Sequence, residues 1–299
     1  MKKKLLLMLN PHAGKAEVKN KLLDIVDLFV KAGYDVTVRP TQRRLEIPDI
    51  LRDEAAQFDL VVCCGGDGTL NETISGLMQN GQKRTIGYIP TGTVNDFATS
   101  LHLSKNMLVA AETIIKGFPF SCDVGQFGDR YFSYVAAFGA FTEVSYQTPQ
   151  EFKNFLGRTA YILEGVKRLA NLASYHVRFD YDDEVIEDDF LLGLITNSYS
   201  VGGFRFISQD RISMCDGKME VLLVKTPHTL SERFAIVNAL LHQRIDPEVM
   251  YFFNASKVKV HTLHEIAWTL DGEYGGSWTD VEVASVKQAV DILVDTKVK

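Results

Sequence analysis

Short apolar runs alternate with amphipathic stretches along roughly the first 120 residues of the chain. Four of the runs have the length of a β-strand and are rich in leucine, valine or isoleucine: residues 4–9, 34–39, 60–64 and 85–89. Three stretches between them repeat their apolar positions with helical spacing: residues 18–31, 50–56 and 70–78. Because strands that alternate with helices are typical of parallel sheets, the pattern predicts an open, mainly parallel α/β sheet.

After residue 121 the pattern changes to closely spaced strands. They are expected at residues 131–137, 175–181, 185–195, 218–224, 257–261, 266–270 and 280–283. Two helices interrupt them, at residues 158–172 and 230–241, and Thr229 with Glu232 has capping-box spacing at the start of the second helix. Such spacing predicts an antiparallel β-sandwich or meander.

The length of 299 residues suits two domains. We expect a nucleotide-binding α/β domain over residues 1–122 and a β-sandwich domain over residues 123–289. Residues 290–299 form a segment that could rejoin the first domain. No Pro/Gly-rich hinge separates the two parts, so they should share a substantial interface.

The composition is that of an ordinary globular protein, with 46% hydrophobic and 23% charged residues. Lys and Arg number 32 and Asp and Glu number 38, which gives a net charge of -6. The chain therefore lacks the broad positive field of a nucleic-acid binder, and we expect no nucleic-acid partner.

The opening sequence MKKKLLLMLN resembles a signal peptide, but its apolar run ends at Asn10-Pro11 and no small-residue cleavage site follows. No apolar stretch approaches the roughly 18 residues of a membrane span. The four cysteines have neither disulfide-framework nor metal-pair spacing: Cys63, Cys64, Cys122 and Cys215. We therefore expect a cytoplasmic protein that is not transmembrane.

Three loops that follow predicted strands carry the candidate chemistry: residues 10–15, 65–72 and 90–96. All three should open at the carboxyl edge of one parallel sheet, where such sheets bind ligands. Their glycines let backbone N–H groups approach phosphate oxygens, and each following helix offers its positive N-terminal end. Thr69 with Glu72, and Thr93 with Asp96, have capping-box spacing, which predicts helix starts just after the glycines.

Any one of these glycine turns could be a plain tight turn, whereas three at one edge favour phosphate binding. None of the loops matches GxxxxGK[ST] or GxGxxG, which argues against a P-loop enzyme and an ordinary dinucleotide dehydrogenase. Asp67 lies among glycines where a triphosphate would bind. Because like charges repel, this carboxylate suits a hydrated magnesium ion better than a phosphate contact.

The motifs NPHAG, GGDGTLNE and PTGTVNDFA, in this order, resemble the diacylglycerol kinase catalytic-domain family, in its soluble bacterial lipid-kinase branch. The resemblance spans the full length, because Asp216-Gly217 and residues 270–273 (LDGE) resemble motifs of the second domain in that branch. GGDG alone is less specific, since 6-phosphofructokinases and NAD kinases have similar motifs and the first domain should share their fold. Asn71-Glu72 together with TGTVND favours the lipid kinases.

The resemblance implies a set of ATP-binding residues: Asn10, Pro11, His12, Ala13, Gly14, Thr41, Gly65, Gly66, Asp67, Gly68, Thr69, Leu70, Asn71, Glu72, Thr93, Asn95 and Asp96. It also implies that Asp67 and Asp96 organise a catalytic magnesium ion through water. Asp271 would be the general base and Glu273 would support it.

A second, structural magnesium ion is implied at Asp216 and the backbone carbonyls of Ser213 and Lys218. The sequence departs from the family pattern here. Cys215 stands where many members have a second acid, and residues 208–210 (SQD) replace the usual Pro-x-Ala. These departures put the occupancy of this second site in question.

The residues around Asp271 also allow a weaker argument that is independent of the resemblance. Phosphorylation of an alcohol needs a carboxylate within hydrogen-bond reach of the hydroxyl and a γ-phosphate in line with it. Asp271-Gly272-Glu273 offers two acids on a turn after an apolar strand. A solvated β-turn is the alternative explanation.

We therefore expect an ATP- and Mg²⁺-dependent lipid kinase that phosphorylates a lipid hydroxyl, with diacylglycerol as the first candidate acceptor and phosphatidic acid as its product. A lipid-binding cleft is expected in the second domain, with peripheral membrane contact only, and the resemblance leaves a homodimer open. Two small basic clusters, residues 2–4 and 43–44, could dock on a membrane. The alternatives are an NAD kinase-like enzyme that acts on a soluble hydroxyl and a non-catalytic nucleotide-binding regulator.

Overall fold

The first part of the molecule contains a parallel four-stranded sheet. A computed structural model describes residues 2–295 except 12, 14–17, 82, 141–168, 170–171 and 204–206. Its parallel strands follow the order β2-β1-β3-β4: β1 (Lys3–Leu9), β2 (Tyr34–Pro40), β3 (Leu60–Gly65) and β4 (Thr85–Pro90). The sequence pattern predicted all four within a few residues.

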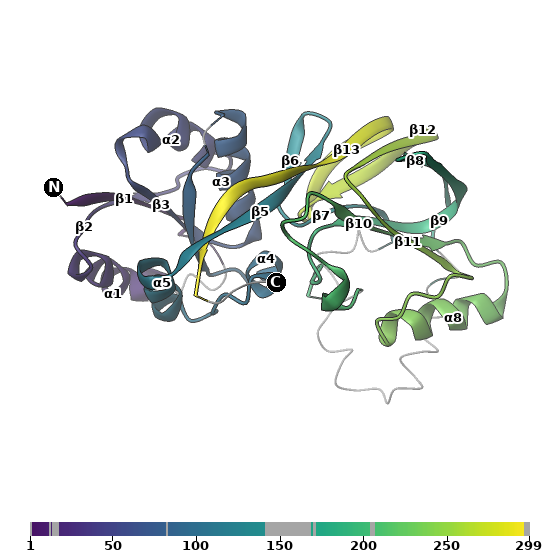
Figure 1. The fold of residues 1–299 in the computed structure, drawn as a ribbon, viewed down its shortest axis with the longest axis horizontal. Helices are drawn as coiled ribbons and strands as arrows, with labels where there is room; N and C mark the ends of the chain where they lie inside the picture. Colours follow the sequence, from purple (N-terminus) through teal and green to yellow (C-terminus); the bar gives the residue numbers. More distant parts are fainter. Residues whose placement is uncertain are drawn as a thin grey trace.

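Helices cover both faces of this sheet (Figure 1). α1 (Val18–Lys31) and α5 (Met107–Lys116) pack on one face, and α2 (Ile47–Glu54) and α3 (Asp67–Gln79) pack on the other. Successive residues of β3 alternate between the two cores, with Val61 facing α2 and α3 and Val62 facing α1 and α5. The inner strands β3 and β4 are buried along almost their whole length because helices cover both of their faces, whereas the edge strand β2 is half-buried or exposed.

The helix predictions differ from the structure at their ends. α2 begins three residues earlier than predicted and continues into a short 3₁₀ turn, η1 (Ala55–Gln57), and α3 also begins three residues earlier. The helix start predicted after Thr93 corresponds to the short helix α4 (Asp96–Ser100), which begins later, whereas α5 was not predicted. Asn106 caps α5 through hydrogen bonds from the amides of Leu108 and Val109, so the asparagine before an apolar run was the signal for this helix.

The second part is β-rich. Its elements follow in the order β5 (Phe118–Phe127), β6 (Arg130–Phe132), β7 (Val135–Gly139), β8 (Tyr175–Tyr181), β9 (Glu184–Thr196), η2 (Gln209–Arg211), β10 (Met219–Lys225), α8 (Leu230–Leu241), β11 (Met250–Ala255), β12 (Lys257–Leu270) and β13 (Glu273–Val294). The strands pair antiparallel, and β7, β12, β8 and β9 pair in a closed cycle. Large aromatic side chains fill its interior: Phe138, Phe179, Phe190 and Trp268.

Several strands of the second part differ from their predictions. The predicted strand 131–137 is divided between β6 and β7, and the two predicted strands 257–261 and 266–270 are one strand, β12, with an irregular register between them. β5 and β11 were not predicted. The helix predicted at residues 230–241 is confirmed with its Thr229–Glu232 capping box. The helix predicted at residues 158–172 falls almost wholly outside the described residues.

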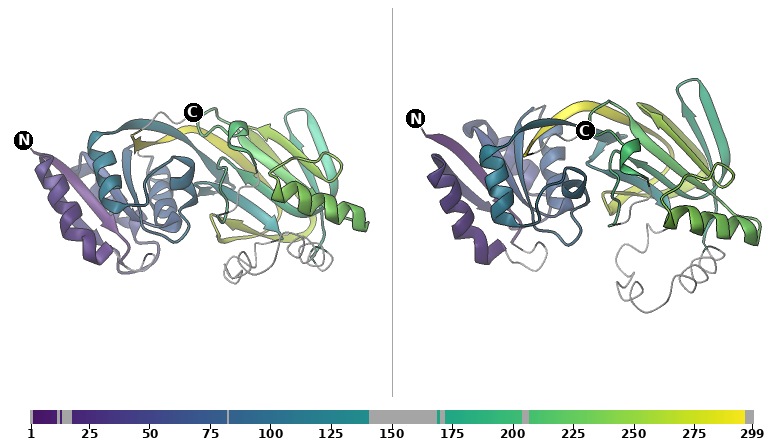
Figure 2. Two further views of the ribbon diagram at one scale, coloured as in Figure 1. Left: turned by 90° about the horizontal axis from the view of Figure 1, so that it is seen from below. Right: turned by 60° about the horizontal axis from the view of Figure 1, so that its bottom comes forward.

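Two long strands, β5 and β13, join the two parts of the molecule. They pair with each other and lie side by side in Figure 1. β13 pairs with β12 over its first half and with β4 at Asp291 and Ile292, so a single hydrogen-bonded sheet runs through the whole molecule. The expected limits at residues 122 and 289 fall inside β5 and β13. The division into two domains stays a prediction. Figure 2 shows both parts from two further sides.

Among the described residues, we find no helix with the length and hydropathy needed to cross a membrane.

Candidate active site

The three predicted loops lie together at the carboxyl edge of the parallel sheet. Backbone hydrogen bonds tie them to one another: the Asn10 amide donates to the Cys64 carbonyl (3.1 Å) and the Thr91 amide donates to the Gly65 carbonyl (2.8 Å). The Thr41 amide, after β2, donates to the Leu9 carbonyl (2.9 Å). Backbone hydrogen bonds therefore link the loops at this edge of the sheet to one another.

Gly66 and Gly92 bring two of the loops into direct backbone contact. A Cβ atom on Gly92 would lie 2.7 Å from the Cα of Gly66, closer than real Cβ contacts allow. A Cβ atom on Gly65 would lie 2.4 Å from the side chain of Thr69. Gly68 differs, because a Cβ atom there would meet no protein atom within 4 Å. Gly65, Gly66 and Gly92 thus have a packing role, whereas Gly68 leaves open space at the start of α3.

The helix starts differ from the predicted capping boxes. Gly66 is the N-cap of α3, so Thr69 lies inside the helix, and no side chain caps it. α4 begins at Asp96, and its first amides are capped from another loop. The amides of Asp96 and Phe97 donate to the carboxylate of Asp67 at 3.1 and 3.3 Å. The predicted pairs Thr69–Glu72 and Thr93–Asp96 are therefore wrong, because Asp67 performs the capping that Thr93 was expected to perform.

Asp67 and Asp96 form a pair of neighbouring acids. The pKa of Asp67 is raised to about 6, mainly by burial and also by the nearby Asp96 carboxylate, while the two amide hydrogen bonds act in the opposite direction. Asp96 is buried and accepts hydrogen bonds from the Ser200 hydroxyl (2.5 Å) and the amides of Gly202 (2.7 Å) and Gly203 (3.0 Å). This carboxylate therefore ties the loop after β4 to the second part of the chain.

The other predicted nucleotide residues fall into four groups. Asn10, Thr41, Thr69 and Glu72 line one cavity of about 290 Å³. Leu70 is fully buried in the core, and the side chain of Asn95 bonds only the backbone of Gly92 in the hydrogen bonds described, so these two support the loops. Pro11 and Ala13 follow β1 in the turn, and Thr93 is exposed. His12 and Gly14 lie outside the described residues.

The same cavity is lined by residues that were not assigned to a nucleotide site: Gln42, Arg43, Arg44 and Ile47. They follow β2, whose carboxyl end lies at the same sheet edge as those of β1, β3 and β4. This position after a strand of the same sheet was the feature of the sequence that could have indicated these residues. Because two of these residues are arginines, the cavity combines positive side chains with the open N-terminal turn of α3.

Asp271 occupies a buried position beside the turn between β6 and β7. Its carboxylate accepts hydrogen bonds from the amide and hydroxyl of Ser133, both at 2.6 Å, and from the amides of Tyr134 (2.9 Å) and Val135 (3.0 Å). The side-chain amide of Asn71, on α3, also donates to it. Burial raises the pKa of Asp271, although the hydrogen bonds from Ser133 act in the opposite direction. An acid with a raised pKa is suited to accept a proton.

Glu273 is more exposed and forms a salt bridge with Arg44. Glu72 lies nearby, and its carboxylate accepts a hydrogen bond from the Leu45 amide (3.1 Å). Burial raises the pKa of Glu72. Arg44–Glu273 and Asn71–Asp271 are two contacts between the first part of the chain and the turn after β12. The structure thus brings Asp271 to α3 and Glu273 to the loop after β2, both in the first part of the chain.

The turn that contains Asp216 offers oxygen atoms to a hard cation. The Lys218 amide donates to the Asp216 carboxylate (2.8 Å), while the neighbouring Asp123 carboxylate accepts from the Gly217 amide (2.6 Å). Glu220 is buried, and one of its carboxylate oxygens has no hydrogen-bond partner among the described residues. Carboxylate and carbonyl oxygens are the ligands that Mg²⁺ prefers, so the turn fits such an ion in its donor chemistry. Within the described ranges no three His, Cys, Asp or Glu side chains converge on a metal position.

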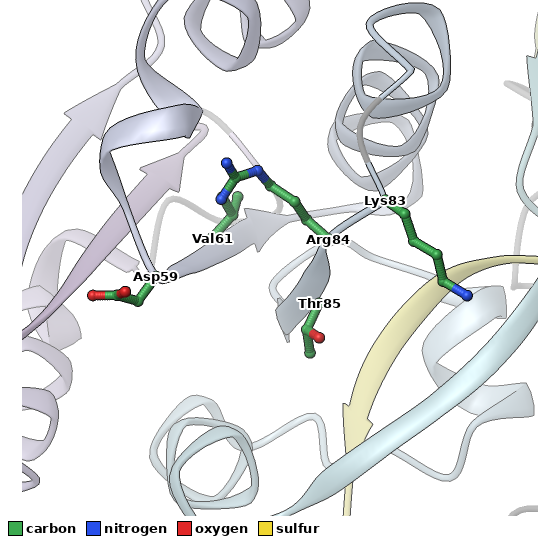
Figure 3. A pocket seen from close by; sticks show the side chains of 5 residues that line it. All are labelled: Asp59, Val61, Lys83, Arg84 and Thr85. Carbon is green, nitrogen blue, oxygen red and sulfur yellow. The ribbon is translucent and has the colours of Figure 1, made fainter.

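A cavity of about 460 Å³ lies away from this site. Its lining residues, Asp59, Val61, Lys83, Arg84 and Thr85, belong to the amino ends of β3 and β4, at the opposite edge of the sheet (Figure 3). The Lys83 and Arg84 side chains point in different directions, and Arg84 donates to the Phe58 carbonyl (2.9 Å). We therefore assign the chemistry to the carboxyl edge.

Comparison with known proteins agrees with this geometry. Residues 4–127 match the diacylglycerol kinase catalytic domain model. The diacylglycerol kinase of Bacillus subtilis (strain 168) is 33% identical over 272 residues, which cover 90% of this chain and 89% of that protein. The diacylglycerol kinase of Staphylococcus carnosus (strain TM300) is 30% identical over 303 residues, with coverage of 100% and 97%. This chain belongs to the diacylglycerol kinase catalytic-domain family.

Solved structures share the fold of this diacylglycerol kinase family member. A Bacillus anthracis str. Sterne protein provisionally named a diacylglycerol kinase superposes with a TM-score of 0.84 and 26% identity, over 100% of this chain and 97% of the other. A diacylglycerol kinase from the same strain has the same fold, with a TM-score of 0.79, 22% identity and coverage of 100% and 99%. The protein is a phosphotransferase with an alcohol acceptor, as the motifs predicted.

Proposed function

We propose that this protein transfers the γ-phosphoryl group of ATP to a lipid hydroxyl in a Mg²⁺-dependent reaction, with diacylglycerol as the acceptor and phosphatidic acid as the product. The names of the relatives support this choice of acceptor. ATP would bind along the three loops at the carboxyl edge, with its phosphates at the open start of α3 beside Gly68.

The contact between Asn71 and Asp271 carries the proposal. Asn71 lies in the second turn of α3, five residues after Gly66, and Asp271 is the predicted base. In-line transfer requires the base, the acceptor hydroxyl and the γ-phosphate to lie within a few ångströms of one another. A direct hydrogen bond between the phosphate-binding helix and the predicted base supports that arrangement.

The hydrogen bonds of Asp271 suggest how it would work. Three of its donors are backbone amides of residues 133–135, which hold the carboxylate in place. The other two, the Ser133 hydroxyl and the Asn71 amide, are side-chain groups that can rotate away. The lipid hydroxyl would take the place of one of these and give its proton to Asp271. Its oxygen then forms the new bond to the γ-phosphorus while the bond to the β-phosphate oxygen breaks, and ADP leaves.

Acidic residues near the loops would hold the metal. Asp67 and Asp96 would bind a hydrated Mg²⁺ through water, and Asp216 with the carbonyls of Ser213 and Lys218 would hold a second ion. A bound Mg²⁺ supplies positive charge that offsets the charge developing on the phosphates. The raised pKa of Asp67 supports the first assignment, because a carboxylate that is buried and lies beside another carboxylate gains from a nearby cation.

Incubation with γ-labelled ATP, Mg²⁺ and diacylglycerol in mixed micelles tests the proposal, with NAD as a parallel acceptor and equilibrium ATP binding as a third measurement. We expect labelled phosphatidic acid. Formation of NADP without a labelled lipid would identify an NAD kinase-like enzyme instead. Tight ATP binding without any product would identify a regulator that has no turnover.

A further inference from the structure

The backbone of Tyr134 is held between the predicted base and the segment that anchors Asp96. Tyr134 belongs to the turn between β6 and β7, and β6 is in contact with α3 (Figure 1). Its amide donates to the Asp271 carboxylate (2.9 Å), and its carbonyl accepts from the Thr196 hydroxyl (2.5 Å). The chain continues from there to residues 200–203, which donate to Asp96. These contacts fix Tyr134 next to the residues that were assigned to the reaction.

The ring of Tyr134 is buried, but its hydroxyl reaches solvent. Tyr134 is only 6% exposed and packs in the same apolar core as Tyr88. The Tyr88 hydroxyl is sealed from solvent and has no hydrogen-bond partner among the described residues. The Tyr134 hydroxyl also makes no hydrogen bond to another described residue, but it is not sealed, so the small exposed fraction of Tyr134 includes this group. A fixed ring that carries an unpaired, accessible hydroxyl presents a hydrogen-bond donor to a ligand.

Four carboxylates lie within electrostatic range of this hydroxyl. Burial raises the pKa of Tyr134 well above its ordinary value of 10.0, and the carboxylates of Asp271, Asp67, Asp96 and Glu273 raise it further. Two of these acids were assigned to the metal and two to the acceptor. The hydroxyl therefore stays protonated near neutral pH, so it donates a hydrogen bond and takes up no proton.

We propose that Tyr134 is a further catalytic residue, whose hydroxyl donates a hydrogen bond to a non-bridging oxygen of the γ-phosphoryl group during its transfer. This inference rests on the proposed function, in which that group passes from the metal-binding acids towards the base. Carboxylates repel a phosphoryl group, so a neutral donor placed among them stabilises the charge that develops on its oxygens.

Tyr134 keeps its own proton throughout the transfer. The lipid hydroxyl gives its proton to Asp271, and its oxygen forms the new bond to the γ-phosphorus while the bond to the β-phosphate oxygen breaks. The tyrosine therefore differs in its role from the base. Its loss should affect the transfer step and leave the binding of the two substrates almost unchanged.

Tyr134→Phe is the informative variant, because it keeps the buried ring and removes only the hydroxyl. Tyr88→Phe is the matched control, since it removes the sealed hydroxyl from the same core. The first measurement is phosphorylation of diacylglycerol in mixed micelles over a range of ATP and lipid concentrations and of pH. The second is calorimetric binding of ADP with Mg²⁺, with and without aluminium fluoride, which mimics the phosphoryl group in transfer.

We expect Tyr134→Phe to lower kcat by a factor of about 10² to 10³, the usual effect of removing one donor from a developing anion. The KM values for ATP and lipid should stay within about twofold, and the shape of the pH profile should not change, because the hydroxyl does not titrate in this range. Aluminium fluoride should tighten ADP binding in the unmodified protein and in Tyr88→Phe but not in Tyr134→Phe. Tyr88→Phe should keep the unmodified kcat, with an equal or higher melting temperature, because it loses an unsatisfied buried hydroxyl.

An unchanged kcat in Tyr134→Phe overturns the inference. An equal loss of kcat in Tyr88→Phe also overturns it, because the effect would then come from the shared core. A raised KM for the lipid at unchanged kcat would assign the hydroxyl to the acceptor instead. Failure of the proposed function is distinct: the unmodified protein then forms no labelled lipid, whereas the aluminium fluoride comparison still tests Tyr134.

Discussion

The side-chain amide of Asn71 donates a hydrogen bond to the carboxylate of Asp271, 200 residues further along the chain. Asn71 extends from α3, which begins at the glycines after β3, and Asp271 directly follows β12 of the β-rich part. The same asparagine accepts a hydrogen bond from the Ser75 hydroxyl (3.0 Å), which fixes its orientation. One side chain thus connects the phosphate-binding helix to the predicted base.

Asn71→Ala removes this connection. We expect lipid phosphorylation to fall by a factor of about 10 to 100, because the base and the phosphate-binding helix lose their fixed spacing. The free energy of unfolding should fall by about 1.5–3 kcal/mol, the usual value of a hydrogen bond to a charged group. Ser75→Ala is the control, and its activity should stay within a few fold of the unmodified protein. Activity of Asn71→Ala within a few fold of that of the unmodified protein would show that the contact has no role in transfer.

Substitutions at Gly92 and Gly68 separate an effect on the stability of the fold from an effect on ATP binding. Gly92→Ala places a methyl group against the backbone of Gly66, so we expect a lower melting temperature as well as weaker ATP binding. Gly68→Ala meets only open space, so its melting temperature should be at least that of the unmodified protein. If phosphates lie at this turn, Gly68→Ala still weakens ATP binding, measured by calorimetry. Unchanged ATP affinity in Gly68→Ala would place the phosphates elsewhere.

The sequence predicted the inner strands β1, β3 and β4 well because most of their residues are buried on both faces and are apolar. The 22-residue strand β13 was the main failure, since only residues 280–283 were predicted. Its exposed and buried positions are mixed, and glycines lie at 275 and 276. What defines this strand is its pairing with β12, β5 and β4, and those partners are distant in sequence.

The motifs predicted which loops meet, but not how their side chains are used. Asp67 caps α4 and Asp96 anchors the loop at residues 200–203, and neither hydrogen bond follows from local spacing. Arg44 could not be assigned from the sequence because its partner, Glu273, lies 229 residues away. Contacts of this kind depend on the sheet that brings distant turns to one edge.

Magnesium should stabilise the protein through the turn at Asp216. We expect the melting temperature to rise with added Mg²⁺ and this rise to be smaller in Asp216→Ala, because a ligand that binds the folded state stabilises it. A crystal grown with magnesium should show oxygen contacts at about 2.1 Å beside Asp216. An ordered turn that holds no ion at saturating magnesium would contradict the assignment despite the orphaned oxygen of Glu220.

Stability should fall as pH rises through the titration of Glu220. Burial raises its pKa from the ordinary 4.5 to about 8, with the nearby Asp216 and Asp123 carboxylates adding to the shift. The folded state therefore holds this proton below about pH 8 and the unfolded state only below about pH 4.5. The stabilisation is complete below the lower value and is lost as pH rises to the upper one, and it amounts to no more than about 5 kcal/mol.

Glu220→Gln should remove this dependence. We expect its melting temperature to change less between pH 5 and pH 9 than that of the unmodified protein, without added metal. Glu265→Gln, on the exposed part of β12, is the control and should leave the pH profile unchanged. Parallel profiles for the unmodified protein and Glu220→Gln would mean that another group governs the pH response.

The most direct test of the account is single-turnover transfer from γ-labelled ATP to diacylglycerol, compared between Asp271→Asn and Glu273→Gln. Asp271→Asn removes the basic carboxylate. Because the asparagine amide nitrogen would face backbone N–H donors, the melting temperature of this variant should fall. Its affinity for ATP should be retained. We expect its transfer rate to fall by a factor of about 10² to 10⁴, with a smaller loss in Glu273→Gln. Near-normal transfer by Asp271→Asn together with an inactive Glu273→Gln would contradict the assignment of the base, and normal transfer by both would contradict the whole mechanism.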